Sequence, residues 1–270
     1  MSTNRVRGDF AAVPGAELWY LDTGGEGRPI VFLHANTGTS ASWENEWARQ
    51  LSFFAGAGFR AIAFDRRGWG RSVAVPATGP QPGSIAGDLD ALADGLHLPP
   101  FHLVGVAGGA FAAIDYAHWR PGRLRSLVAG ASTGQVVDDE IAGFIARIRV
   151  PELVDPASVF ALEVSAGYRG SSPEGAAAWR EIAEHARQAG AVPQPLRTPN
   201  TYAKLSEIRV PTLVMVGSAD LIAPPKLMER WAARLPGHEL ATIVGAGHSL
   251  AYEEPDQFNR LVHEFIVRQG

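Results

Sequence analysis

Short apolar runs alternate along the chain with stretches of helical periodicity. The runs have the pattern of strands that are covered on one or both faces, and they lie at 17–21, 29–33, 60–64, 101–106, 126–129, 211–216 and 239–244. Between them, apolar residues recur at helical spacing from Ile85 to Leu96 and from Pro255 to Phe265. This alternation predicts an α/β fold with a mostly parallel central sheet flanked by helices.

One long region interrupts the alternation. From residue 135 to 207 no convincing strand is present, and apolar stripes at helical spacing run from Ile141 to Ile148 and from Trp179 to Ala186. Several prolines punctuate the region. We therefore predict a helical lid over 135–207, with 1–134 and 208–270 forming the core domain. A lid of this kind covers a site at the carboxyl ends of the strands.

Composition and charge exclude several classes of function. The chain has 270 residues and no cysteine, which excludes disulfides, thiolate metal sites and a cysteine nucleophile. The net charge of −4 gives no general attraction to nucleic acid. The longest apolar run, about 103–114, is shorter than the ~18 residues that cross a bilayer. With no targeting segment visible at the N-terminus, we expect a cytoplasmic protein, monomeric or homodimeric, with no membrane partner.

A glycine-rich turn follows the apolar run that ends at Val106. The sequence Gly105-Val106-Ala107-Gly108-Gly109 closes a predicted strand and opens a predicted helix. Glycines at this spacing permit a sharp turn that lifts residue 107 above the sheet, with the helix N-terminus beneath it. This is the geometry of the nucleophile elbow G-x-S-x-G, in which the middle residue is serine. Here the middle residue is alanine.

Three further elements lie in the order that accompanies such an elbow. Asp220 follows the predicted strand 211–216, and His248 follows the predicted strand 239–244. Asn36 lies in a loop directly after the strand 29–33. The backbone N–H groups of Asn36 and Gly108 are expected to converge on an oxyanion above residue 107.

With these motifs the chain resembles the α/β-hydrolase superfamily. The resemblance runs from about residue 17 to 265 and includes the segment Asp65–Ser72, which is similar to the family turn D-x-R-G-x-G-x-S. It implies that Asp220 and His248 are the acid and the histidine, and that Ala107 stands at the nucleophile position. The chain looks most similar to lid-bearing enol-lactonases, esterases and carbon–carbon bond hydrolases. The resemblance implies no metal and no organic cofactor.

The alanine limits the mechanism, because a methyl group cannot attack a carbonyl. Three hypotheses remain open. In the first, Ala107 is an introduced replacement of serine. In the second, Ala107 is native, and the His248–Asp220 pair acts directly as a general base on water or substrate. In the third, the protein only binds a small molecule. Under the second hypothesis the same pair could also run a cofactor-independent lyase or oxygenase reaction.

The predicted substrate is a small, mainly apolar carbonyl compound, namely an ester, a lactone or a 1,3-dicarbonyl. Candidate substrate contacts are His34 and Trp43 near the oxyanion loop and Phe144 and Trp179 in the lid. His34 could instead shape its loop by hydrogen bonds, and the two lid aromatics could instead belong to a helix core. The hydroxyl of Ser132 does not lie on the elbow and is expected to make turn hydrogen bonds.

Overall fold

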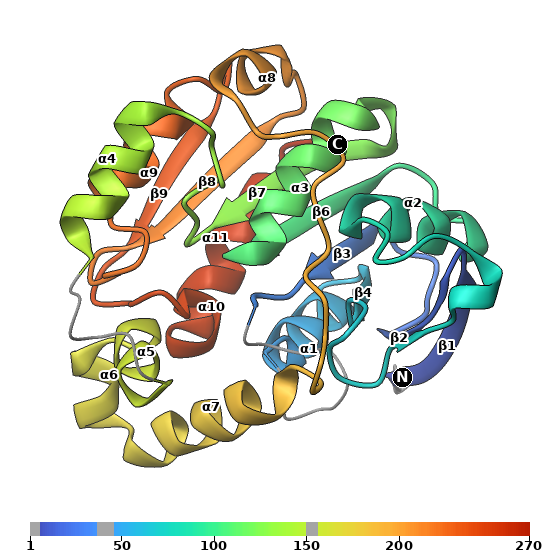
Figure 1. The fold of residues 1–270 in the computed structure, drawn as a ribbon, viewed down its shortest axis with the longest axis horizontal. Coiled ribbons are helices and arrows are strands. Elements are labelled where there is room, and N and C mark those ends of the chain that lie inside the picture. The colour runs from blue at the N-terminus through green and yellow to red at the C-terminus, as the bar shows by residue number, and fades with distance from the viewer. Residues whose placement is uncertain (1–5, 37–45, 150–155) are drawn as a thin grey trace.

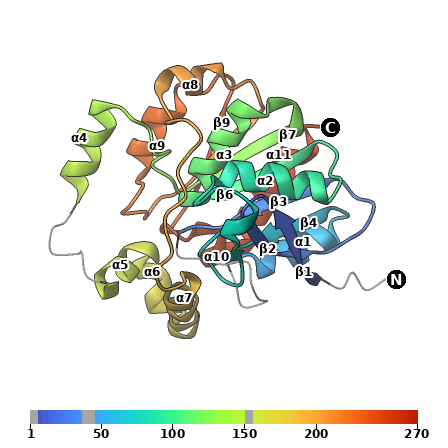
Figure 2. The same cartoon turned by 45° about the vertical axis from the view of Figure 1, so that its right-hand side comes forward.

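The computed structural model describes residues 6–36, 46–149 and 156–270, and it shows a central sheet with helices on both faces (Figures 1 and 2). The strands are β1 (Arg7–Val13), β2 (Ala16–Asp22), β3 (Pro29–Leu33), β4 (Arg60–Phe64), β5 (Val73–Ala74), β6 (Phe101–Val106), β7 (Leu124–Gly130), β8 (Thr212–Gly217) and β9 (Glu239–Ile243). The α-helices are α1 (Ala48–Gly56), α2 (Ile85–Gly95), α3 (Gly108–Trp119), α4 (Asp139–Ile148), α5 (Pro156–Glu163), α6 (Ala166–Ser171), α7 (Pro173–Ala186), α8 (Tyr202–Glu207), α9 (Pro225–Ala232), α10 (Leu250–Glu253) and α11 (Pro255–Val267). Short 3₁₀ turns lie at η1 (Pro76–Thr78) and η2 (Pro121–Arg123).

The sheet is mostly parallel. In the described residues its strand order is β1-β2-β4-β3-β6-β7-β8-β9, with β5 paired to β2. The pairings of β1, β2 and β5 are antiparallel, whereas β4, β3, β6, β7, β8 and β9 run parallel to one another. This confirms the predicted α/β fold. Parallel strands bring their carboxyl ends to one edge of the sheet, and the loops that follow β3, β6, β8 and β9 meet there.

Helices cover both faces of the sheet, which explains why the central strands are mostly apolar. One core cluster joins the sheet to α2, α3 and α9, and a second joins it to α1, α10 and α11. Every residue of β3, β6 and β8 is buried. A strand that is covered on both sides has no face for polar side chains.

Between β7 and β8 the described residues form helices α4 to α8 and no strand. These helices pack in different places and do not form one compact layer. Helix α4 packs against α9, and α8 packs against α3, so both lie against the core. Helices α5, α6 and α7 lie together in one layer next to α10 (Figure 1). The turned view separates this layer from α4 (Figure 2).

The hydrophobic pattern did not predict the first strand. Strand β1 is exposed over its first four residues, and only Val13 at its end is buried. It pairs along its whole length with β2 at the edge of the sheet. An edge strand with so little buried surface leaves no apolar run to recognise.

Candidate active site

Ala107 occupies a strained turn between β6 and α3. Its backbone has φ 47° and ψ −115°, a conformation that non-glycine residues rarely adopt and that costs about 1–3 kcal/mol. The glycines on either side are required by close packing. A Cβ on Gly105 would lie 2.6 Å from the carbonyl oxygen of Gly109, and a Cβ on Gly109 would lie 2.2 Å from the carbonyl oxygen of Leu33. The backbone therefore has the sharp strand-to-helix turn that the glycine spacing predicts.

His248 and Asp220 form a hydrogen-bonded pair at the ends of β9 and β8. The Nδ1 atom of His248 lies 2.9 Å from Oδ2 of Asp220. The other carboxylate oxygen accepts hydrogen bonds from the backbone N–H groups of Ile222 and Ala223, each at 2.8 Å. Because an ionised carboxylate only accepts hydrogen bonds, Nδ1 of His248 carries the hydrogen and Nε2 is left for chemistry.

The charges around this pair shift its pKa values in opposite directions. Burial would lower the pKa of His248, but the charge and hydrogen bond of Asp220, together with the carboxylates of Glu163 and Glu46, raise it above the ordinary value. Burial would raise the pKa of Asp220, but His248 and the two backbone amides hold it below its ordinary value. The pair is therefore an ionised carboxylate beside a histidine that is more basic than usual.

The loop after β3 lies directly over the N-terminus of α3. A Cβ on Gly108 would lie 2.2 Å from Oδ1 of Asn36, so these two residues are in close contact. Gly108 is the first residue of α3, where backbone N–H groups have no partner within the helix. Asn36, Ala107, Gly108 and His248 line one cavity. The structure thus brings together the residues that the sequence assigned to the base and to the oxyanion donors.

A buried arginine holds this loop in place. A terminal nitrogen of the Arg66 guanidinium donates to the carbonyl oxygen of Ala35 at 2.8 Å and to Oδ1 of Asn36 at 3.1 Å. On the other side, the N–H of Ala35 donates to the carboxylate of Glu46 at 2.9 Å. Burial lowers the pKa of Arg66 to about 10 and raises the pKa of Glu46 to about 8.

His34 lies below the loop and not in the cavity. It is fully buried, its Nδ1 lies 2.6 Å from the carbonyl oxygen of Ala35, and its Nε2 accepts from the N–H of Arg66 at 3.1 Å. Burial and the charge of Arg66 hold its pKa well below the ordinary value. His34 is therefore a neutral side chain that shapes the loop, and its predicted contact with substrate is not part of this geometry.

The cavity beside Ala107 has a volume of about 190 Å³. Its lining is partly apolar and partly polar, and consists of Ala35, Asn36, Ala107, Gly108, Phe111, Ala131, Ser132, Thr133, Glu163, Ile222 and His248. The hydroxyl of Ser132 donates to the carbonyl oxygen of Ala107 at 3.1 Å and accepts from the N–H of Gly134 at 3.0 Å. It makes the turn hydrogen bonds that its position predicted.

The two lid aromatics proposed as substrate contacts, Phe144 and Trp179, do not line this cavity. Phe144 on α4 faces α9, where its ring lies 5.4 Å from the guanidinium carbon of Arg230. Trp179 on α7 is 1% exposed and does not line the cavity, but its Nε1 donates to Oε2 of Glu163 at 3.2 Å. Trp43 lies outside the described residues.

Sequence reasoning missed Glu163, which does line the cavity. It is the last residue of α5, and no motif or spacing distinguishes it from other acidic residues of that region. Its position depends on a contact between distant segments, because its carbonyl oxygen accepts from the N–H of Ser249 at 2.9 Å. Only the folded chain brings the two together.

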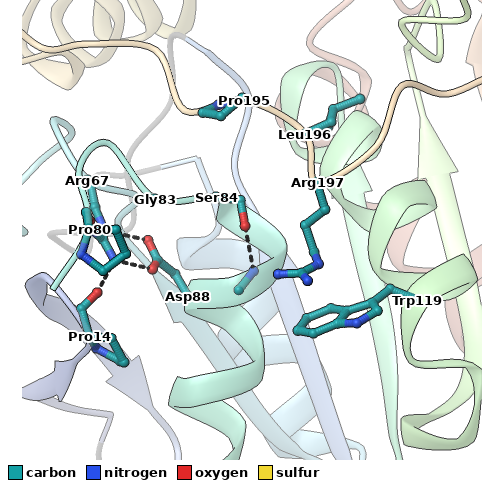
Figure 3. Close-up of a pocket in the computed structure, with 11 residues that line it drawn as sticks. Pro14, Arg67, Pro80, Gly83, Ser84, Asp88, Trp119, Pro195, Leu196 and Arg197 are labelled. Carbon is teal, nitrogen blue, oxygen red and sulfur yellow. Dashed lines mark hydrogen bonds and ion pairs between the residues drawn. The ribbon is translucent and has the colours of Figure 1, made fainter.

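A larger cavity of about 490 Å³ lies between α2, α3 and the segment 195–197 (Figure 3). Its charged groups are already engaged. Arg67 forms a buried ion pair with Asp88 at 2.6 Å, and Arg197 lies over the ring of Trp119 at 3.6 Å (Figure 3). The lining contains no histidine and shares no residue with the cavity at Ala107. The His248–Asp220 pair therefore meets the smaller cavity, through His248.

No group of three or more His, Cys, Asp or Glu side chains arranged to hold a metal ion occurs among the described residues. Within the same residues, no helix is long and apolar enough to cross a membrane.

Several known proteins of similar sequence and fold are named as hydrolases, esterases or lactone-degrading enzymes. Residues 30–261 match the alpha/beta hydrolase family. A 2-hydroxy-6-oxononadienedioate/2-hydroxy-6-oxononatrienedioate hydrolase of Burkholderia vietnamiensis is 30% identical over 94% of this chain and 93% of that protein. Among solved structures, an esterase from Thermogutta terrifontis superposes with a TM-score of 0.79 at 24% identity, over 98% of this chain and 99% of the other. An N-acyl homoserine lactone degrading enzyme superposes with a TM-score of 0.74 at 29% identity, over 95% and 100%.

The chain belongs to the α/β-hydrolase family. This membership supports an enzyme of the hydrolase class that acts on a small molecule.

Proposed function

We propose that this protein hydrolyses a small, mainly apolar carbonyl compound, an ester, lactone or 1,3-dicarbonyl, by direct attack of water. His248 is the general base, and Asp220 orients it and stabilises its cation. The single observation that carries the proposal is the hydrogen-bonded His248–Asp220 pair in a cavity whose nucleophile position holds only a methyl group. The relatives named as an esterase and a lactone-degrading enzyme support the substrate class.

The chemistry balances with water as the only co-reactant. Nε2 of His248 takes a proton from water as the water oxygen bonds to the carbonyl carbon. The carbonyl oxygen becomes an oxyanion, which the N–H groups of Asn36 and Gly108 stabilise. When the tetrahedral intermediate collapses, the bond to the leaving group breaks and the imidazolium returns its proton to that group. The products are an acid and an alcohol from an ester, one hydroxy acid from a lactone, and an acid and a ketone from a 1,3-dicarbonyl.

Asn36 also has a role through its side chain. Its Oδ1 accepts from Arg66, so the positive charge of Arg66 lies directly behind the proposed oxyanion donors. A cation in this buried position favours negative charge on the cavity side of the loop. Arg66 is therefore a positioning residue for the loop and an electrostatic support for the oxyanion.

We further propose that residues 135–207 act as the lid of this cavity and that 1–134 and 208–270 form the core domain. The contribution of Glu163 to the cavity supports this division. Because α4 and α8 pack on the core, the layer α5 to α7 is the part of the segment that would cover substrate.

A second candidate function is that of a serine hydrolase whose nucleophile has been replaced. The observation in its favour is the strained backbone of Ala107, which this turn imposes whether or not the side chain reacts. In serine hydrolases that strain presents a nucleophile to the histidine.

One experiment separates the two candidates. The unaltered protein and Ala107→Ser are compared on 4-nitrophenyl esters, enol-lactones and 1,3-dicarbonyls, with the first milliseconds of product release recorded. Under our proposal the unaltered protein turns over without a burst, and Ala107→Ser brings no large gain. An inert alanine protein and a burst in Ala107→Ser would instead assign the chain to the second candidate.

A further inference from the structure

A carboxylate from the lid segment faces the same cavity as the histidine. Glu163 is 6% exposed and lines the cavity with Ala107 and His248. The indole N–H of Trp179 donates to Oε2 of Glu163 at 3.2 Å, and the Trp179 ring packs 4.8 Å from the ring of Tyr252. A buried, packed ring thus fixes where this carboxylate points.

The backbone around Glu163 is joined to the loop that carries His248. The carbonyl oxygen of Glu163 accepts from the N–H of Ser249 at 2.9 Å. The carboxylate of Glu253 then accepts from the N–H of Ser165 at 3.1 Å and from the N–H of Gly247 at 3.0 Å. Glu163 and the following Ser165 are therefore joined by hydrogen bonds to the loop that contains Gly247 and Ser249, the neighbours of His248.

In the part of the cavity lining that the structure describes, Glu163 is the one carboxylate. The described lining contains Glu163 and His248 as ionisable side chains and no lysine or arginine. Arg66 is not part of the lining, and its guanidinium donates to the loop behind Asn36.

The negative charge of Glu163 affects the pKa values of two neighbouring side chains. It contributes to the raised pKa of His248 and to that of Glu46. A negative charge raises the pKa values of neighbouring groups in this way, and the effect is larger where little water lies between the groups to screen the charge.

We propose that Glu163 selects substrates that carry a positive charge, such as an ammonium group a few bonds from the reacting carbonyl, over neutral and anionic substrates of the same shape. Specificity of this kind arises because a like charge in a water-poor cavity is penalised and an opposite charge is favoured. This inference names the substrate class of the proposed hydrolase and rests on that proposal. It sets this chain apart from a relative that is named for a dienedioate, which is a dianion.

Binding is tested first, with ligands that cannot be hydrolysed. Isothermal titration calorimetry compares (4-oxopentyl)trimethylammonium with its neutral isostere 6,6-dimethylheptan-2-one in the unaltered protein, in Glu163→Gln and in a control. The control is Glu174→Gln, an exposed residue of α7. We expect the cation to bind about tenfold more tightly or better in the unaltered protein and in the control, and the ratio to fall to about one in Glu163→Gln. Equal binding of the two ketones by the unaltered protein would overturn the proposal, whatever the fate of the variant.

Turnover separates this inference from the proposed function. The same comparison is made with the ester pair acetylcholine and 3,3-dimethylbutyl acetate. Hydrolysis of both esters at equal kcat/KM would overturn the role of Glu163 while the proposed hydrolysis stands. A tenfold binding preference for the cationic ketone without hydrolysis of either ester would support the role of Glu163 and count against the proposed reaction.

Discussion

His248 and Asp220 keep the geometry of a proton-transfer pair although the neighbouring side chain is a methyl group. The carboxylate of Asp220 is held by two backbone amides in addition to the histidine. A pair that is positioned by three hydrogen bonds does not need a serine to keep its orientation. A methyl group at residue 107 therefore rules out an acyl-enzyme through that side chain but leaves the proposed base in position.

The raised pKa of His248 predicts the pH dependence of the reaction. In the proposed reaction the neutral imidazole is the base, so kcat/KM should rise with pH through the pKa of His248, above its ordinary value of 6.5. Glu163 contributes to this shift, and Glu163→Gln should therefore move the midpoint to lower pH. The check is a pH profile of both proteins on a neutral ester. A profile that is flat across this range in active protein would contradict the assignment.

Glu46 predicts a pH dependence of stability. Burial raises its pKa to about 8 from 4.5, so the folded protein binds this proton more tightly than the unfolded chain. Its contribution to the free energy of unfolding is complete below pH 4.5 and is lost as the pH rises toward 8, with a slope of up to about 1.4 kcal/mol per pH unit.

The measurement is urea unfolding of the unaltered protein and of Glu46→Gln between pH 5 and pH 8. Glutamine keeps an oxygen that can accept from Ala35 but does not titrate. The raised pKa of His248 acts in the same direction, and the difference between the two curves contains the titration of Glu46 together with its small coupling to His248. We expect the difference to change steadily with pH, and a constant difference would show that Glu46 does not titrate as described.

At the scale of the element, the turn between β6 and α3 is the part of the site that sequence predicts best. Gly105 and Gly109 mark it, and the structure shows that a side chain at either position would meet backbone atoms. The order of the following strands also places Asp220 and His248 at the same edge of the sheet. Such features are encoded locally, by glycine and by strand ends.

A pair of glycine variants tests this close packing. Gly109→Ala should lower the free energy of unfolding by about 1–3 kcal/mol or more, because its Cβ would lie 2.2 Å from the carbonyl oxygen of Leu33. Gly122→Ala is the matched control, since its Cβ would meet no atom within 4 Å. It should change stability by no more than about 0.5 kcal/mol. Equal effects in chemical denaturation would contradict the packing.

Sequence pattern predicts less about where helices pack. The apolar stripe that contains Phe144 correctly indicates a helix, but it does not identify the neighbour that covers it, and that neighbour is α9. The same limit hides Glu163, whose place in the cavity depends on hydrogen bonds between residues that are far apart in the chain. Hydrophobic periodicity predicts that one face of a helix is buried, but only the tertiary structure shows which element covers that face.

At the scale of the whole molecule, the sheet gathers groups from distant parts of the chain at one edge. The loop after β3 supplies Asn36, the turn after β6 supplies Ala107, and the ends of β8 and β9 supply Asp220 and His248. The segment between β7 and β8 adds Glu163 to the lining of the cavity. Parallel topology therefore explains both the site and its family resemblance.

The most direct test of the account is the initial rate of ester hydrolysis by the unaltered protein and by His248→Ala. The exposed His185 provides the control variant His185→Gln. We predict that the unaltered protein turns over, that the control matches it, and that His248→Ala loses about 10²- to 10⁴-fold in kcat/KM. An unaltered protein that is no faster than His248→Ala would contradict the central claim that this histidine is the base.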